Sequence, residues 1–442
     1  MNVILLVVLA GLMHATRSFA PGDAGGSAGP LLAFGYVLVS AFFAGGLFKR
    51  LGLPRLTGYI AAGIVAGPMV LGLVSRDVVA SLDVVNGIAI AMIGLTAGNE
   101  IELRAMKPLL RSIAGITAVG VLGTTVLLAA AVWLMRPLLP FMNGLQPAQA
   151  TAVALVLGVV MVVQSPAVVV ALRNELRADG PVVRTALGVV VLGDLVVIVL
   201  FPIVSTITKA AFGDGSDAVH AASTLGWEIF GSLAAGAVVG VLLALYLRKV
   251  AGGASMFLFL VMVVVAEVGR RLHFDPLLVA LSAGMVVRNG TKLGDALEHE
   301  LQPSSLPVSI VFFAVAGASL HLDVLALVWL PAGVVVLVRG AGLLLGSRLG
   351  ARLAGAPANV QRYAGVGLLP QAGLALALSM LFAKTFPEFG AEASALTLGV
   401  VALNELFAPA VYRLVLLRCG EVGRREATPS GAPAEAPALD VR

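Results

Sequence analysis

Residue types that indicate a metal centre or a disulfide-stabilised protein are scarce in this sequence. The single cysteine, Cys419, excludes an intramolecular disulfide and a cysteine-based metal site. The five histidines lie far apart, without the short spacing that metal ligands share. The chain also lacks a recognisable pairing of a nucleophile with a base. We therefore expect no metal site, no cofactor and no enzymatic activity.

Charge is scarce as well: 12% of the 442 residues are charged, 59% are hydrophobic, and the mean hydropathy is +1.01. A soluble chain carries about twice that share of charge. Apolar runs long enough to cross roughly 30 Å of hydrocarbon recur along the chain. Because water cannot satisfy the backbone there, these runs must be helical. The sequence predicts an all-α polytopic membrane protein.

Thirteen spans are predicted within a transmembrane region over residues 31–417. Their expected positions are 31–48, 56–73, 84–98, 112–135, 148–172, 182–204, 225–247, 254–269, 276–287, 303–319, 324–346, 361–383 and 393–417. Residues 1–20 combine an apolar segment, Val3–Met13, with small residues at Ser18 and Ala20, which predicts a signal peptide or an additional helix. The Pro/Ala/Glu-rich tail over residues 420–442 is predicted to be disordered and cytoplasmic.

The distribution of Lys and Arg predicts the orientation of these spans. With the N-terminus outside, 21 of the 29 Lys and Arg residues fall on the inside and seven on the outside. Cytoplasmic loops carry such an excess. We therefore expect a protein of the inner membrane with a periplasmic N-terminus and a cytoplasmic C-terminus. The net charge of +5 then belongs to loops facing the cytoplasm, and no nucleic-acid partner is expected.

Short patterns recur in two halves of the chain, about 31–204 and 254–417. The small-residue pattern of 57–65 returns at 278–286, and that of 97–103 returns at 316–322. Each match relates one span to the seventh after it, so the second copy would cross the membrane in the opposite sense. Such inverted-topology repeats are typical of secondary transporters. Small residues could also serve helix packing alone.

Two prolines at corresponding places predict broken helices. Gln164 and Ser165 precede Pro166, and Gln371 follows Pro370. Proline removes a backbone hydrogen bond, and unwound backbone at membrane depth occurs only inside protein or along a cavity. We expect the two broken helices to cross at mid-membrane, where their ends would stabilise ions of opposite charge. A purely structural kink is the alternative.

One carboxylate stands at the centre of a predicted span. Asp194 follows Gly193 in the otherwise apolar run 189–200. A carboxylate at this depth costs roughly 2.5–3.5 kcal/mol on insertion scales. We therefore expect Asp194 to carry a proton or bind a cation, with a helix-joining salt bridge as the alternative. Gly193 would leave backbone accessible to an ion, or simply allow close helix packing.

Three further charged residues are candidates for the same site. Arg339, the only basic residue away from the ends of a predicted span, is expected near Asp194 or the crossing as charge compensation, unless it extends to the interface. Glu405 lies 211 positions after Asp194 and could line the same cavity or form a structural pair. Glu100, at a span end, could keep a cytoplasmic funnel negative or belong to a solvated face.

Taken in order, these motifs resemble the cation/proton antiporter superfamily, in particular its bacterial branch. The resemblance covers about residues 31–417 and rests on Thr57–Pro68, Ala97–Ile101, Ser165–Ala167, the Asp194 span and Gly367–Gly373. It implies a thirteen-helix fold, a homodimer, and a core of two crossed broken helices that moves against a dimerisation domain. In that family the site that matches Asp194 usually consists of two consecutive polar residues, whereas in this chain the first of the two positions is Gly193.

The resulting hypothesis is a secondary active antiporter that exchanges a monovalent cation, Na⁺ or K⁺, for protons in the lipid bilayer by alternating access. Asp194, Gly193, Gln164 and Ser165 would form the ion and proton site. A single carboxylate that binds either a proton or a cation predicts electroneutral exchange. The alternatives are an organic-anion symporter of related fold and a non-transporting membrane sensor.

Overall fold

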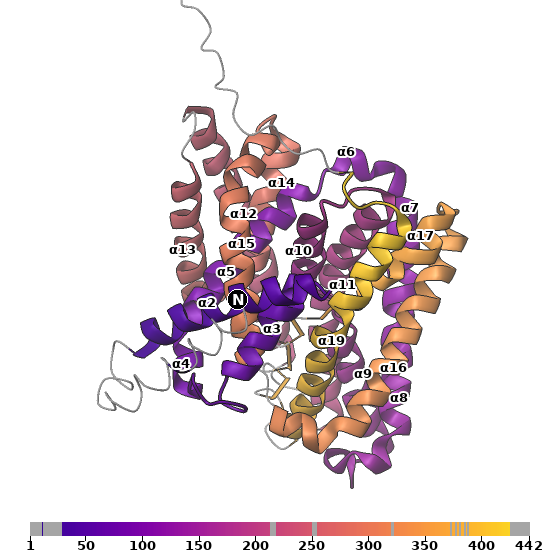
Figure 1. Ribbon diagram of the computed structural model, residues 1–442. Coiled ribbons are helices and arrows are strands. Elements are labelled where there is room, and N and C mark those ends of the chain that lie inside the picture. Colours follow the sequence, from indigo (N-terminus) through magenta and orange to yellow (C-terminus); the bar gives the residue numbers. More distant parts are fainter. Residues whose placement is uncertain are drawn as a thin grey trace, which may run out of the picture.

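The computed structural model describes residues 29–212, 218–249, 254–319, 322–371 and 389–424, with residues 11, 374, 375, 378, 379, 382, 383 and 386. Throughout these residues the regular structure is helical, without a strand (Figure 1). The expectation of an all-α protein is therefore confirmed. The predicted signal peptide over residues 1–20 lies outside the described residues except for Gly11, and so does most of the predicted tail.

One set of helices, which we call the panel, lies mainly on the left of Figure 1, and its members pack chiefly against one another. The panel consists of α2 (Gly29–Arg50), α3 (Arg55–Ala66), α5 (Asp83–Glu100), α12 (Ala218–Lys249), α13 (Ser255–Leu272), α14 (Pro276–Gly290) and α15 (Gly294–Ala318), with the short α4 (Arg76–Ser81) beside α2. Helix α15 is bent by 64° between Leu301 and Leu306.

A second set, which we call the bundle, lies mainly on the right of Figure 1. It consists of α7 (Leu110–Ile116), the π-helical turn η2 (Thr117–Leu122), α8 (Gly123–Leu134), α9 (Pro147–Val162), α10 (Pro166–Leu176), α11 (Pro181–Ala211), α16 (Leu322–Leu353), α17 (Ala358–Tyr363), η5 (Ala364–Leu368) and α19 (Gly390–Cys419). Helix α6 (Leu103–Met106) and η1 (Lys107–Leu109) connect the panel to α7, and η3 (Arg136–Leu138) and η4 (Pro140–Met142) connect α8 to α9.

The small residues of the repeated patterns bring helices of the panel into backbone contact. In the contact of α3 with α15, a Cβ at Gly63 would collide with the carbonyl of Ala314, and one at Gly317 with the carbonyl of Ile60. In the contact of α5 with α14, a Cβ at Gly98 would collide with Leu281, and one at Gly284 with Leu95. The two contacts correspond through the sequence offsets of the repeat, so each glycine has a counterpart in the other half.

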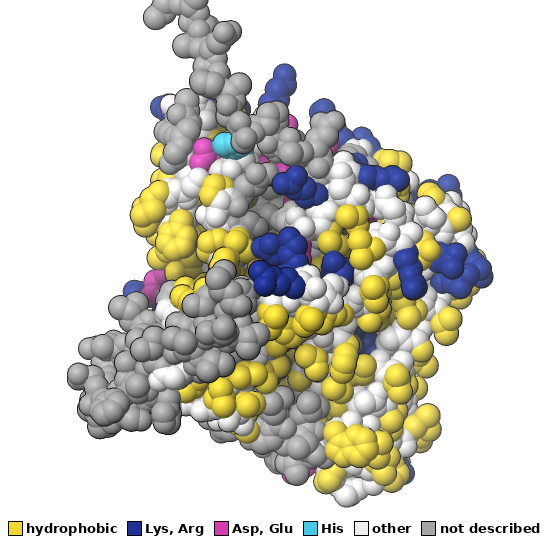
Figure 2. Space-filling model, viewed as in Figure 1, with side chains coloured by type: hydrophobic (Ala, Val, Ile, Leu, Met, Phe, Trp, Pro, Cys, Tyr) yellow, Lys and Arg dark blue, Asp and Glu magenta, His cyan; other side chains and the backbone are white. Residues whose placement is uncertain are grey.

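The described helices include six that are long and apolar enough to cross a membrane, or seven if the bent α15 counts as one span. Large apolar side chains face outward, such as Val126, Phe230 and Leu337, which are 65%, 69% and 74% exposed. Figure 2 shows hydrophobic side chains spread over the flank of the molecule. The chain is therefore a multi-pass membrane protein, while the number of thirteen spans stays a prediction.

Candidate ion-binding site

The first helix break separates α9 from α10 in the middle of the bundle. Helix α9 ends at Val162, and α10 begins at Pro166, which occupies the first turn, where a missing N–H costs nothing. Ser165 caps α10, because its Oγ accepts a hydrogen bond from the backbone N–H of Val168 at 3.4 Å. Gln164 and Ser165 are 1% and 2% exposed. The structure thus places unwound backbone inside the protein, with the start of a helix next to it.

The second break follows η5. Leu368 ends this short helix, the Leu369 N–H still donates to the Val366 carbonyl at 3.2 Å, and Leu369 to Gln371 are not part of any helix. The two residues after Gln371 lie outside the described part of the chain. Gln371 is fully buried, and its Nε2 donates to the Met161 carbonyl of α9 at 2.9 Å. The two breaks predicted at Pro166 and Pro370 therefore lie against each other, although they are about 200 residues apart.

Arg339 of α16 joins the two breaks. Its Nε donates to the Met161 carbonyl at 2.8 Å, and its Nη2 donates to Val163 at 2.7 Å. The same guanidinium donates to Leu369 at 2.7 Å and to Leu368 at 3.2 Å. These carbonyls lie at the C-terminal ends of α9 and η5, where a positive charge is stabilised. The side chain is completely buried, so it does not extend to the interface.

Arg339 lies at the crossing, one of the two places expected for it, but its partners are backbone carbonyls. Within the described residues, no ion pair joins it to Asp194 or to any other carboxylate. The guanidinium therefore compensates the negative ends of two half-helices. Its role as a counter-charge for an empty ion site remains a prediction.

An amide that the sequence analysis did not single out extends the crossing to α19. Asn404 donates from Nδ2 to Gln371 Oε1 at 3.0 Å and to the Val400 carbonyl at 3.0 Å. Asn404 is 6% exposed. A polar amide next to Glu405 in an otherwise apolar span was the available signal. Gln371 is thus held from both sides, by Met161 and by Asn404.

Asp194 of α11 and Gln164 of the first break each have a buried side-chain oxygen in the region where α11 passes the break. Asp194 is 5% exposed and its Oδ1 has no hydrogen-bond partner among the described residues, and the same holds for Gln164 Oε1. The backbone amide of Gln164 interacts with the Asp194 carboxyl. A Cβ at Gly193 would lie 2.5 Å from Gln164 Oε1. Gly193 therefore makes the room in which the Gln164 carbonyl oxygen lies beside α11.

Such an arrangement is chemically suited to a cation. Carboxylate and amide oxygens are ligands of hard cations, and buried oxygens without partners are costly unless a ligand or water satisfies them. The positive end of α10 and Arg339 lie close by, so the site is not purely negative. In the described residues, no group of three or more His, Cys, Asp or Glu side chains could hold a metal ion.

Glu405 of α19 is a second buried carboxylate in the bundle. It is 1% exposed, and neither carboxylate oxygen has a hydrogen-bond partner among the described residues. Its neighbour Asn404 contacts the second break through Gln371. The expectation of a structural ion pair finds no support in the described residues, whereas a place near the crossing agrees with the Asn404 contact.

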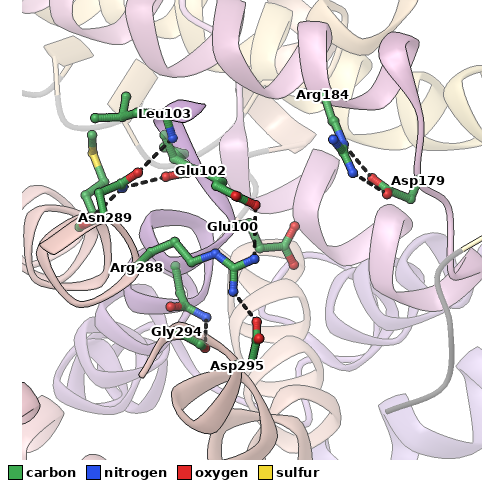
Figure 3. A network of polar contacts seen from close by, with 12 residues as sticks. Glu100, Glu102, Leu103, Asp179, Arg184, Arg288, Asn289, Gly294 and Asp295 are labelled. Atoms are coloured by element: carbon green, nitrogen blue, oxygen red, sulfur yellow. Dashed lines mark hydrogen bonds and ion pairs between the residues drawn. The ribbon is translucent and has the colours of Figure 1, made fainter. Parts of the chain in front are cut away.

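Glu100 lies away from the crossing, at the end of α5 that leads to α6, which we call the α6 end of the molecule. Its side chain is 3% exposed and forms an ion pair with Arg173 of α10, so it connects the panel to the bundle. Close by, Arg288 of α14 pairs with Glu102 at 3.2 Å and with Asp295 of α15 (Figure 3). Glu100 is therefore part of a polar network rather than a solvated face.

Asp179, in the turn between α10 and α11, belongs to the same end of the molecule. Its carboxylate accepts hydrogen bonds from Arg184 at 2.7 and 3.0 Å (Figure 3). It also pairs with Arg173 at 3.2 Å. Burial by itself would raise the pKa of Asp179, but the hydrogen bonds and positive charges of Arg184 and Arg173 outweigh it and lower the pKa below its ordinary value. This carboxylate is therefore ionised at neutral pH.

Comparison with known proteins decides the family. The model of the family described as "Sodium/hydrogen exchanger, transmembrane" matches residues 37–417, most of the chain. The chain belongs to the sodium/hydrogen exchanger family. The resemblance noted from the sequence motifs is thereby confirmed, and the family is one of transporters rather than enzymes.

Two solved structures share the fold. The structure of the sodium proton antiporter MjNhaP1 from Methanocaldococcus jannaschii at pH 8 superposes with a TM-score of 0.62 at 17% identity, covering 89% of this chain and 99% of that one. An electron-microscopy structure of the same antiporter gives a TM-score of 0.61 at 15% identity, covering 87% and 96%. At these identities the likeness concerns the fold alone.

A relative with higher identity matches over a shorter stretch. The protein named iron transporter MagA of Paramagnetospirillum magneticum (strain ATCC 700264 / AMB-1) is 31% identical over 177 residues. This stretch covers 39% of this exchanger-family chain and 37% of that protein, so the match spans little more than a third of its length.

Proposed function

We propose that this exchanger-family protein exchanges a monovalent cation, Na⁺ or K⁺, for protons, and that Asp194 carries the exchanged ion. The observation that carries the proposal is the pair of buried oxygens without partners, Asp194 Oδ1 and Gln164 Oε1, beside unwound backbone. A proton or a cation on Asp194 would each neutralise the same carboxylate. Competition between them couples the two fluxes, and one charge for one charge makes the exchange electroneutral.

The composition of the site favours a monovalent cation over iron. A single carboxylate with a neutral amide supplies one negative charge and hard oxygen donors. Divalent transition metals prefer sites with imidazole, thiolate or several carboxylates. The name of the MagA relative nevertheless makes ferrous iron a necessary arm of any transport assay. An organic anion is disfavoured, because the cation at the crossing, Arg339, already has four carbonyl partners.

We further propose that the panel and the bundle move against each other, so that the site opens alternately to either side of an inner membrane. In support, polar contacts join the two sets of helices at the α6 end. They are the Glu100–Arg173 ion pair, the hydrogen bonds from the Arg55 backbone N–H to Glu175 at 3.1 and 3.2 Å, and that from Arg413 to the Gly52 carbonyl. Breaking these contacts would open the α6 end, which the Lys and Arg distribution predicts to be cytoplasmic.

The test is proton flux in proteoliposomes containing a pH-sensitive dye, with Na⁺, K⁺, Li⁺ or Fe²⁺ added in turn. We expect one or more monovalent cations to drive proton movement in the wild type and Asp194→Asn to abolish it. Asp77→Asn, an exposed acid of α4, is the matched control and should transport normally. Exchange by Asp194→Asn at the wild-type rate would refute the assignment of the site. Exchange driven by Fe²⁺ alone would refute the choice of cation.

A further inference from the structure

A cavity of about 300 Å³ lies between α2 and α3 at the α6 end, outside the crossing. Its lining includes three aromatic side chains, Phe42, Phe43 and Tyr59, and three cations, Lys49, Arg50 and Arg55. Lys49 and Arg50 form the last turn of α2 and are exposed, whereas Tyr59 is 2% exposed and forms the wall. The cavity is therefore basic at its mouth and aromatic along its side.

The positive charge exceeds what the fold needs at this place. Lys49 and Arg50 lie at a helix C-terminus, where cations stabilise the helix dipole. Arg55, in contrast, is the first residue of α3, where a positive charge is unfavourable. The Glu175 carboxylate lies beside Arg55 and offsets part of this charge, so one carboxylate stands against the three cations of the cavity.

One carboxylate approaches this group from the bundle, and it is already engaged. Both oxygens of Glu175 accept the backbone N–H of Arg55, and the guanidinium of Arg413 also lies near it. Among the described residues, no carboxylate forms an ion pair with Lys49 or Arg50. The cavity thus has a net positive charge, which complements an anion.

Apolar surface next to the charges indicates which kind of anion fits. Phe42 is 50% exposed and Leu51, just after α2, is 66% exposed. Figure 2 shows a dense group of Lys and Arg side chains on the face of the molecule where α2 and α3 lie, with hydrophobic side chains directly below it. A free phosphate would use the charges only. A phospholipid would use both, its phosphate on the cations and its acyl chains along the phenylalanines.

We infer that this cavity binds the headgroup of an anionic phospholipid. Binding of the lipid does not depend on the proposed transport, because it rests on other residues, whereas its effect on transport rests on the proposed function. The site lies beside contacts between panel and bundle, since Arg55 meets Glu175 and Gly52 meets Arg413. A lipid bound here stabilises the closed α6 end, so the lipid composition of the membrane regulates the exchanger.

Binding is tested first on the purified protein in neutral detergent, through the shift in thermal unfolding caused by added phosphatidylglycerol. Each Lys or Arg near an anionic surface contributes about 1 kcal/mol, roughly fivefold in affinity. The double variant Lys49→Gln/Arg50→Gln is therefore expected to bind roughly 30-fold more weakly. The control Arg348→Gln/Arg352→Gln removes two exposed arginines from the end of α16 and should bind like the wild type.

Two additives distinguish the lipid from other ligands. Phosphatidylcholine supplies acyl chains without net charge and is expected to give no shift, and inorganic phosphate supplies the anion without acyl chains and is expected to give none either. The inference is overturned if phosphatidylglycerol fails to stabilise the wild type, if phosphate stabilises it equally, or if the control pair loses binding as much as the cavity pair. Asp194→Asn should keep the lipid-induced shift in unfolding temperature. The test of lipid binding can therefore be interpreted even if the transport proposal fails.

Discussion

The substitution Gly193→Ala separates the role of the Gln164 oxygen from that of the Asp194 carboxylate. A Cβ at residue 193 would lie 2.5 Å from Gln164 Oε1 and 3.6 Å from Val121 Cγ2. The second contact is ordinary, but the first requires the amide oxygen to retreat by about 1 Å to reach a normal separation. The carboxylate itself stays unchanged, so the variant alters one of the two proposed ligands alone.

The expected effect is a weaker cation affinity with little loss of stability. Contacts of a neutral group with a charge contribute about 1.5–3 kcal/mol, which corresponds to roughly ten- to hundredfold in the apparent KM for the cation. For stability, overpacking costs about 1–3 kcal/mol, and replacing a helical glycine by alanine returns about 1 kcal/mol. Gly123→Ala in α8 is the control, because a Cβ there meets no atom within 4 Å.

The assay is cation-driven proton flux in proteoliposomes over a range of cation concentrations, together with thermal unfolding of each variant. Gln164→Ala is measured alone and combined with Gly193→Ala. If both changes act through the same oxygen, the double variant should have the KM of Gln164→Ala, which is strongly non-additive. An unchanged KM in Gly193→Ala, or additive effects in the double variant, would refute the assignment of Gln164 as a ligand.

Three further predictions concern other charged groups of the bundle. Arg339→Lys should lower the thermal unfolding temperature by several degrees, because one ammonium group cannot donate to four carbonyls on two segments. An unchanged unfolding temperature would contradict the conclusion that Arg339 joins the two breaks. Glu405→Gln should raise the unfolding temperature, since its oxygens have no described partners, and should shift the pH profile of exchange if the carboxyl takes up protons; an unmoved profile places it outside the proton path. Asp179 has a lowered pKa, so its contribution to stability is present at neutral pH and lost as the pH falls below about 4; Asp179→Asn should flatten this acid-side loss in unfolding temperatures measured from pH 3 to 7, and an unchanged slope would contradict it.

The parts of the fold that were predictable depend on local chemistry. The break before Pro166 lies where the sequence predicts it, because proline at a helix start acts through its own backbone. The paired small-residue patterns likewise correspond to the contacts of Gly63 and Gly284 with opposing backbones. The span expected over 56–73 was too long, since α3 ends at Ala66, directly before Gly67 and Pro68. These two residues were an available signal for an earlier end.

What was not predictable depends on partners distant in sequence. Burial of Arg339 could be anticipated from its apolar surroundings, but its four carbonyl partners depend on how two breaks meet in space. The pairing of Glu100 with Arg173 joins residues on different helix groups, and no local pattern encodes it. Asn404 was missed because a single amide in an apolar span has no periodicity. Sequence therefore indicated the candidate residues, while the structure supplied their partners.

The bonds of Arg339 have a consequence for leakage. One side chain holds the ends of two separate helices, so neither end can swing aside by itself to leave a water-filled passage. Parting them would break either the two hydrogen bonds of Arg339 to the end of α9 or the two to the end of η5. Each contributes about 1.5–3 kcal/mol because the donor is charged, and the carbonyls left behind would be buried and unpaired. Under the proposed exchange, we therefore expect the two helix ends to move together as one unit, so that no water-filled passage for protons opens between them.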